Sequence, residues 1–176
     1  LQLTEGEFSH SLLTTTDLVP QQFVWVMASP DGLLARTVED KLPRLSGHEA
    51  PAMLIRANTK DTLFMVTDKG EAAAIPLHVL PQAEKPSEGV MFNKISSLSK
   101  AERLAALFAL PAKTERAEGW FVLTVTRQGM VKKSSISELP GASAQTFALC
   151  KINPGDRLGW ALLTDGKADL IIGTAK

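Results

Sequence analysis

The sequence predicts an all-β protein built from repeated units, three of them complete and a fourth only begun. Its 176 residues include 12 glycines and 10 prolines, which separate short apolar runs. This spacing suits many short strands better than a few long helices. Three of the runs share one pattern, in which an apolar stretch is followed by Ser or Thr, two further residues and Gly. Such repeats indicate units that stack on one another to build the core.

Each unit predicts a β-hairpin. The apolar run is expected to form a buried strand, and the following glycine a tight turn with positive φ. The segment after the glycine then returns as a second strand. The runs and their glycines are 24–28 with Gly32, 63–66 with Gly70, and 121–125 with Gly129. Further strands are expected at 53–57, 90–95 and 147–152.

A Leu-Pro pair follows each glycine at the same distance. The leucine lies 10 residues after the glycine and the proline 11 residues after it. The three pairs are Leu42-Pro43, Leu80-Pro81 and Leu139-Pro140. Because proline cannot donate to a β-ladder, we expect each pair to end the returning strand. An identical offset in three units is hard to assign to chance.

The two ends of the chain frame the repeat. Residues 170–176 reproduce the apolar run and the Thr that precedes the glycine by three residues in the other units. We therefore expect a fourth unit that continues beyond Lys176. Residues 1–16 are expected to form a linker or tail, and residues 17–176 a partial repeat domain.

One segment carries conflicting signals. Residues 99–102 resemble a helix capping box, and the Ala- and Leu-rich residues 103–110 favour a helix by propensity. In the next unit, however, residues 158–163 occupy the matching place after a turn at 153–156. The repeat therefore favours a strand over 104–110, with the helix as the alternative. Residues 113–119, which are rich in charge, are expected to form a solvated loop.

The composition limits the classes of function. Lys plus Arg and Asp plus Glu both number 19, so the formal net charge is zero. Any surface for a polyanion must then be a local patch rather than a global field. No apolar run approaches the roughly 20 residues that cross a bilayer. The single cysteine, Cys150, cannot form an internal disulfide, which fits a reducing cytoplasm.

The residue types that carry chemistry are scattered. His10, His48 and His78 show no spacing typical of metal ligands. No glycine-rich phosphate loop of the Walker type is present. Cys150 lies in an apolar run and is expected to be a core residue rather than a nucleophile. Core packing is also expected for the three tryptophans, Trp25, Trp120 and Trp160.

These patterns resemble the C-terminal domain of the A chain of DNA gyrase and of its topoisomerase IV counterpart. The segments that carry the resemblance are 17–20 leading into 23–36, then 61–70, 88–90, 127–133 and 155–158. The resemblance implies a β-pinwheel, a disc of propeller-like blades that exchange strands, of which this chain holds about three units and part of a fourth. It also implies that the rim of the disc binds and bends duplex DNA. That DNA is then presented for ATP-dependent passage through a break made elsewhere in the enzyme.

The resemblance also carries expectations about partners and catalysis. The partners that it implies are double-stranded DNA, the topoisomerase catalytic core and the B subunit, with no membrane. ATP and Mg²⁺ are expected on other domains or subunits, so no cofactor is expected here. The family cuts DNA with a tyrosine, and this chain has no tyrosine. The chain is therefore expected to have no catalytic residue of its own.

One segment departs from the family pattern. The A chains of gyrases carry a basic, glycine-rich box after the first returning strand, and residues 41–50 stand in its place here. Only Arg44 and Gly47 suggest that box, and its later counterpart at 140–145 has no basic residue. Strong DNA wrapping is then less expected, and a chain like that of topoisomerase IV becomes more plausible. The sequence leaves gyrase and topoisomerase IV both open.

DNA contact is the candidate function that remains. Nonspecific binding needs Lys and Arg side chains spaced to meet phosphates. The candidates are Arg36, Lys41, Arg44, Lys69, Arg127, Lys132 and Lys133. If equivalent positions share one rim, these cations form a basic track. The alternative is that they are ordinary solvated charges at strand edges, on a propeller-like protein-interaction module that has lost DNA wrapping.

Overall fold

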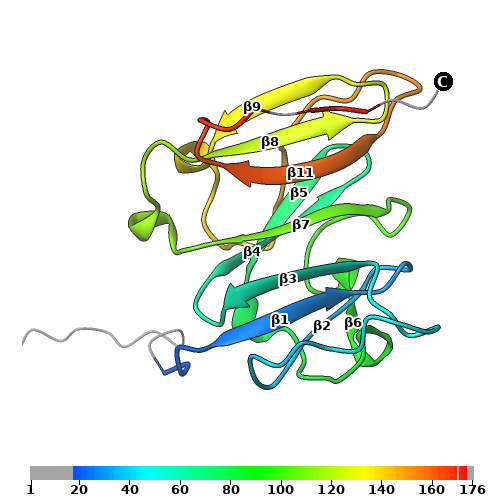
Figure 1. The fold of residues 1–176 in the computed structure, drawn as a ribbon, viewed down its shortest axis with the longest axis vertical. Coiled ribbons are helices and arrows are strands. Elements are labelled where there is room, and N and C mark those ends of the chain that lie inside the picture. Colours follow the sequence, from blue (N-terminus) through cyan, green and yellow to red (C-terminus); the bar gives the residue numbers. More distant parts are fainter. Residues whose placement is uncertain (1–17, 170, 174–176) are drawn as a thin grey trace, which may run out of the picture.

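Eleven strands in three antiparallel sheets make up the computed structural model, which describes residues 18–169 and 171–173. The sheets have the strand orders β3-β1-β2-β6, β10-β5-β4-β7 and β11-β8-β9. Figure 1 shows the sheets one above the other along the long axis, the first at the bottom and the third at the top. The described residues contain no α-helix, so the all-β prediction is confirmed.

The three units correspond to the three sheets. The first unit contains β1 (Phe23–Ala28), β2 (Leu33–Arg36) and β3 (Met53–Asn58). The second contains β4 (Thr62–Thr67), β5 (Glu71–Pro76) and β7 (Leu104–Leu110). The third contains β8 (Phe121–Thr126), β9 (Val131–Ser135) and β11 (Leu158–Thr164). The connections hold β6 (Val90–Met91) and β10 (Thr146–Ala148), and the 3-10 helices η1 (Leu77–Val79), η2 (Pro86–Glu88), η3 (Phe92–Lys94), η4 (Lys113–Glu115) and η5 (Ile136–Glu138).

The predicted hairpins are confirmed in all three units. The turn glycines Gly32, Gly70 and Gly129 have φ values of 92°, 83° and 87°. In each turn the glycine N–H donates to the carbonyl of the Ser or Thr three residues earlier, at 3.0 Å. This left-handed backbone strains any residue with a Cβ, which explains why glycine recurs here.

Strands are exchanged between neighbouring units. β6, from the connection between β5 and β7, pairs with β2 and so completes the first sheet. β10, from the connection between β9 and β11, pairs with β5 and completes the second. Each of the first two units thus receives its outer strand from the unit that follows. In the third unit β9 remains at the edge of its sheet, because no strand among the described residues pairs with its outer side.

Two of the expected connecting strands are shorter than predicted. Of residues 90–95 only Val90–Met91 is a strand, because the backbone turns into η3 and buries Phe92 at 1% exposure. Of residues 147–152 only the start is a strand, since β10 ends at Ala148. The strand expected at 53–57 is confirmed as β3.

The prediction that each Leu-Pro pair ends a strand was wrong. β5 and β9 end earlier, at Pro76 and Ser135, and the 3-10 helices η1 and η5 follow them. Leu80 and Leu139 come after these helices and lie in the core at 2% and 5% exposure. In the second and third units, the leucine of the pair therefore anchors the 3-10 helix that precedes it. Leu42, which follows no such turn, is 50% exposed.

The ambiguous segment 104–110 is a strand, as the repeat favoured. β7 pairs with β4 from Leu110 opposite Thr62 to Leu104 opposite Thr67. Its side chains are buried on both faces, so pairing and packing override the helical propensity. The later turn is confirmed by a hydrogen bond from the Asp156 N–H to the Asn153 carbonyl at 3.0 Å.

The predicted start of a fourth unit falls mostly outside the described residues. Of residues 170–176, the structure describes only 171–173, and these form no strand. The tail expected over 1–16 also lies outside the described residues. The repeat is therefore confirmed for three units.

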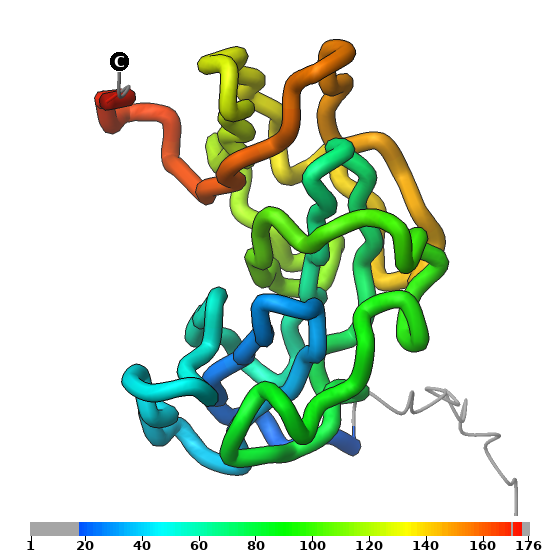
Figure 2. Tube along the Cα trace, turned by 90° about the vertical axis from the view of Figure 1, so that its right-hand side faces the viewer, coloured from blue at the N-terminus to red at the C-terminus, as the bar shows by residue number. Residues whose placement is uncertain are grey.

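Two apolar clusters hold the sheets together. The first packs the first sheet on the second, and the second packs the second sheet on the third. Phe64 stacks on Phe108 with ring centroids 4.8 Å apart. Phe147 packs edge-on against Phe64, with ring centroids 6.3 Å apart. The strands β3, β7 and β11 contact one another in turn and line the inner side of the three units. Figure 2 shows the units following one another along the long axis.

The core predictions hold for the cysteine but not for all tryptophans. Cys150 lies in the second cluster at 6% exposure, and burial raises the pKa of its thiol. Trp120 and Trp160, in contrast, are 43% and 47% exposed, so core packing was the wrong prediction for them. Along β11 side chains alternate between its two faces, and Trp160 lies on the open one while Ala161 is buried. Trp25 is partly buried.

Candidate nucleic-acid interface

Arg36 is the first predicted cation along the chain, and it is covered. It ends β2 and is only 9% exposed, and burial lowers the pKa of its guanidinium. Its N–H donates to the Pro81 carbonyl at 2.9 Å. With the Gln82 amide oxygen turned toward it, the guanidinium donates to that oxygen at 3.1 and 3.3 Å. Arg36 thus holds the segment 81–83 and is not open to a ligand at the surface.

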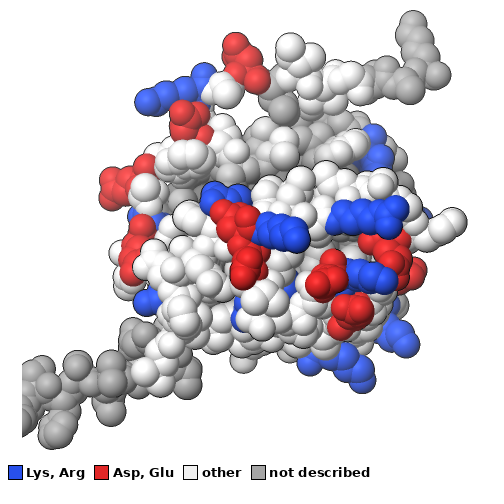
Figure 3. All heavy atoms as spheres, turned by 60° about the horizontal axis from the view of Figure 1, so that its bottom comes forward, with Lys and Arg blue, Asp and Glu red and all other residues white. Residues whose placement is uncertain are grey.

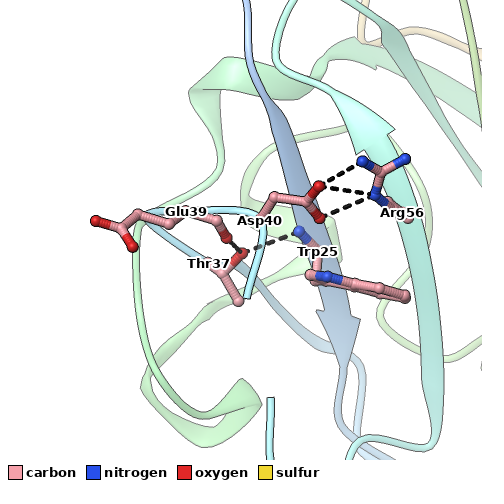
Figure 4. A network of polar contacts seen from close by, with 5 residues as sticks. All are labelled: Trp25, Thr37, Glu39, Asp40 and Arg56. Carbon is pink, nitrogen blue, oxygen red and sulfur yellow. Dashed lines mark hydrogen bonds and ion pairs between the residues drawn. The ribbon is translucent and has the colours of Figure 1, made fainter. Parts of the chain in front are cut away.

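The loop that carries Lys41 and Arg44 is anchored at its start. Thr37 accepts a hydrogen bond from the Trp25 backbone N–H at 2.9 Å. The Asp40 carboxylate accepts two from the Arg56 Nε, at 2.8 and 3.0 Å, as Figure 4 shows. This pairing with Arg56 lowers the pKa of Asp40. The loop therefore leaves β2 tied to both β1 and β3.

Charges of both signs surround this loop. Lys41 and Arg44 are exposed and line a hollow of about 470 Å³ together with Glu39, Glu84 and Lys85. Lys85 forms an ion pair with Glu49, N to O 2.7 Å. In Figure 3, which brings the first unit forward, Lys and Arg side chains lie among Asp and Glu side chains. The first unit thus offers no field of a single sign at the place of the degenerate box.

The third unit collects three of the predicted cations. Arg127 is exposed beside the turn between β8 and β9, with its guanidinium 4.7 Å from the centroid of the Trp160 ring. Lys132 donates from Nζ to the Leu149 carbonyl at 2.8 Å. Lys133 places Nζ 3.8 Å from the centroid of the Phe121 ring. These cation–π contacts orient the two charges without neutralising them.

The remaining predicted cation belongs to the second unit. Lys69 is exposed in the turn between β4 and β5. The structure therefore places Arg127, Lys132 and Lys133 on one hairpin, where the consecutive Lys132 and Lys133 point to opposite faces of β9, and it leaves Lys69 on a neighbouring unit.

The cations do not recur at equivalent exposed positions. Lys133 lies four residues after its turn glycine, and the residues at that offset in the other units are Arg36 and Ala74. Both of these are buried, and Ala74 is 0% exposed. The outer strands β2 and β5 are covered by the exchanged strands β6 and β10. The exposed cations of the outer strands are therefore confined to the third unit.

Two arginines were missed by the sequence reasoning. Arg103 directly precedes β7, and Arg157 directly precedes β11. Both are exposed, and with Arg127 they line a second hollow of about 410 Å³. The signal was present, since residues 104–110 and 158–163 were aligned as equivalent strands and each is preceded by Arg.

Other kinds of site find little support in the described part of the chain. There, no three His, Cys, Asp or Glu side chains gather as metal ligands would. No helix among the described residues is long and apolar enough to span a membrane.

Comparison with known proteins identifies the fold. No family model matches the chain. The A chain of DNA gyrase from Streptococcus pyogenes serotype M1 is 25% identical over 174 residues, covering 92% of this chain and 21% of that protein. The crystal structure of the C-terminal domain of DNA topoisomerase IV superposes with a TM-score of 0.65 at 23% identity, covering 84% of this chain and 47% of that one. The chain has the β-pinwheel fold.

The structure of the DNA gyrase A C-terminal domain is also similar, with a TM-score of 0.59 at 16% identity, covering 81% of this chain and 48% of that one. The resemblance to gyrase and topoisomerase IV C-terminal domains is thereby confirmed. The pinwheel described here spans about a fifth of the length of the curated gyrase chain that it matches.

Proposed function

We propose that this pinwheel is a non-catalytic DNA-binding and DNA-bending domain from the A chain of a bacterial type IIA topoisomerase, and that it acts in the cytoplasm. It presents a duplex segment for strand passage, while the B subunit, the catalytic core, ATP and Mg²⁺ act elsewhere. Similarity to the gyrase and topoisomerase IV C-terminal domains supports the parent enzyme. The observation that carries DNA binding is the basic hairpin of the third unit.

This hairpin has the chemistry of a phosphate-contacting surface. Arg127, Lys132 and Lys133 are exposed, and no acidic residue lies between them in the sequence. None of the three forms an ion pair within the described part of the chain. Their charges are therefore free to replace the counterions of a duplex. Contacts of this kind read the DNA backbone and shape rather than base sequence.

A salt series tests the proposal. Each neutralised phosphate contributes about −0.9 to the slope of log affinity against log salt concentration. Replacing Lys132 and Lys133 together by Gln should therefore make the slope shallower by about 2, as measured by fluorescence anisotropy on a labelled duplex. The control replaces two exposed lysines elsewhere, Lys100 and Lys113, by Gln. Affinity that is absent at low salt, or insensitive to salt, contradicts the proposal.

Bending is tested on the same complexes. Energy transfer between dyes at the two ends of the duplex should rise when the chain binds. A bound duplex whose ends stay as far apart as in free DNA argues for binding without bending.

A protein-interaction module is the second candidate, and a specific observation favours it. Large apolar side chains are exposed on the third unit: Trp120, Met130, Val131, Trp160 and Leu162. The net charge of zero also gives DNA no global attraction. An interaction with a type IIA catalytic core that persists at high salt supports this candidate, because apolar contacts are not screened.

A further inference from the structure

Equivalent residues of all three units meet at one hollow. It is the hollow of about 410 Å³ already described, beside the starts of the inner strands β3, β7 and β11. The turns contribute Pro30, Asp68 and Arg127, each two residues before its turn glycine. The residues just before the inner strands contribute Ala52, Arg103 and Arg157. The repeat itself thus builds this place, at the end of the sheets where the hairpin turns meet the starts of the inner strands.

The hollow carries an excess of positive charge. Arg103, Arg127 and Arg157 line it, and Asp68 is the one carboxylate of the lining, so three positive charges face a single negative one. None of the three guanidiniums is paired with a carboxylate in the described residues. Asp68 instead accepts a hydrogen bond from the Arg103 backbone N–H at 3.3 Å. Like charges gathered without partners raise the local affinity for an anion.

The backbone around the arginines is held in place. The carboxylate of Asp156, 4% exposed, accepts from the backbone N–H groups of Arg157 at 2.7 Å and Gln128 at 3.1 Å. The Arg127 N–H donates to the Arg157 carbonyl at 2.8 Å, which joins the turn to the inner strand. The backbone of Arg127 and that of Arg157 are therefore fixed before any ligand arrives, which lowers the entropic cost of binding.

The second and third units also share a β-bulge beside their arginines. Ala105 is the extra residue between the pairs formed by Leu104 and Ala106, and Gly159 is the extra residue in β11. A Cβ at Gly159 would lie 3.4 Å from the Arg127 Nε, so the absence of a side chain leaves room for that guanidinium. Bulges re-aim nearby side chains. The first unit has no such bulge, because Met53 pairs in register with Ala28. It also has Ala52 in the place of the arginine.

We propose that this hollow is a phosphate-binding site, in which Arg103, Arg127 and Arg157 hold one phosphate group or two linked ones. A terminal phosphate group presents three acceptor oxygens and can meet three guanidinium forks at once, whereas a carboxylate, like a single phosphodiester of a DNA strand, presents two. A hollow of this volume suits a compact ligand and is too small to admit a duplex. The phosphate comes either from a small phosphate-bearing molecule or from a DNA strand whose backbone reaches the hollow.

Calorimetric titration of the whole chain with tripolyphosphate tests the site. We expect saturable binding that weakens about tenfold in Arg103→Gln and in Arg157→Gln, the loss of one charge-assisted contact each. Lys113→Gln, which removes an exposed cation outside both hollows, should leave the affinity unchanged. Circular dichroism confirms that each variant is folded. Because Arg127 lies over Trp160, tryptophan fluorescence should change in the same titration and lose that change in Trp160→Phe.

Two further arms identify the source of the phosphate and the class of anion. If the Arg103 and Arg157 variants also weaken duplex binding and tripolyphosphate displaces DNA, the phosphate belongs to the DNA backbone. If duplex affinity is unaffected, it belongs to a small molecule. Absent binding, equal affinity for citrate, or an equal loss in Lys113→Gln overturns the proposal. The outcome is separate from that for Lys132 and Lys133, because those residues lie outside the hollow.

Discussion

The first two units and the third unit contain the same hairpin, but what covers it differs. The carbonyl of Gly32 accepts from the Phe92 N–H at 3.1 Å, and that of Gly70 accepts from the Leu149 N–H at 2.9 Å. Phe92 and Leu149 directly follow the exchanged strands β6 and β10, so each turn is sealed by the next unit. Around Gly129 nothing among the described residues lies within 4 Å of where a Cβ would be.

This difference decides which cations meet the solvent. Arg36 and Lys133 stand at the same offset from their turn glycines, yet one is buried and the other exposed. The strand that carries Arg36 is flanked by β6 and the segment 81–83, whereas the outer edge of β9 has no partner in the described residues. Equivalent positions in a repeat are therefore equivalent in backbone but not in environment. A basic residue in a strand of this fold is therefore open to solvent only where no exchanged strand or connecting segment covers it.

The largest expected effect comes from alanine at the turn glycines. A Cβ at Gly70 would lie 2.2 Å from the Cys150 carbonyl oxygen, and one at Gly32 would lie 2.7 Å from the Phe92 ring. Gly70→Ala should therefore cost about 3 kcal/mol or more in free energy of unfolding, because backbone must move and the left-handed φ is strained. Gly129→Ala meets only the strain and should cost about 1 kcal/mol, with Gly32→Ala between them. Urea denaturation measures these free energies of unfolding. Equal losses for Gly70→Ala and Gly129→Ala would contradict the conclusion that the next unit seals the Gly70 turn and leaves the Gly129 turn open.

A smaller effect is expected at Asp156, in the turn that precedes β11. Burial alone raises the pKa of Asp156, but the Thr126 hydroxyl and the N–H groups of Arg157 and Gln128 together lower it below the usual value. A carboxyl with a depressed pKa in the folded state stabilises the fold above its unfolded pKa of about 4 and loses this contribution as pH falls through the folded value. Asp156→Asn should thus lower the melting temperature at pH 7, and the gap from the parent protein should close in acid.

The control for that experiment is Asp31→Asn, which removes an exposed carboxyl from the turn of the first unit. At pH 7 it should change the melting temperature far less than Asp156→Asn does, because its carboxyl is exposed. A gap for Asp156→Asn that widens below about pH 4 has the wrong sign and excludes a stabilising carboxylate there.

The smallest effect is expected in the first unit, at the ion pair between Asp40 and Arg56. Their side chains are 38% and 45% exposed, so water and salt screen the attraction. Arg56→Gln should lower the melting temperature only slightly, and the change should shrink as salt is added. Arg56→Lys keeps the charge but loses the fork geometry, so its melting temperature should lie between those of the parent protein and of Arg56→Gln. A large loss that salt does not reduce would mean that the contact of Arg56 with the Phe23 ring, 4.1 Å away, matters more than its charge.

The repeat pattern alone was sufficient to predict the three hairpins. An apolar run, a polar residue and a glycine at fixed spacing specify a strand, a turn with positive φ and a returning strand, all of which are local. The same pattern resolved the helical signal at 103–110 in favour of β7. It was misleading for Trp120 and Trp160, because an apolar run predicts burial on both faces and only pairing shows which face stays open.

The sequence by itself determined the all-β repeat, the three turns and the family that they resemble, because these depend on contacts between residues close along the chain. Only the tertiary structure decided which cations are available and that Arg103, Arg127 and Arg157 share one hollow. The physical reason is that strand exchange and the stacking of units bring together residues that are distant in sequence, and no local pattern records what will cover them.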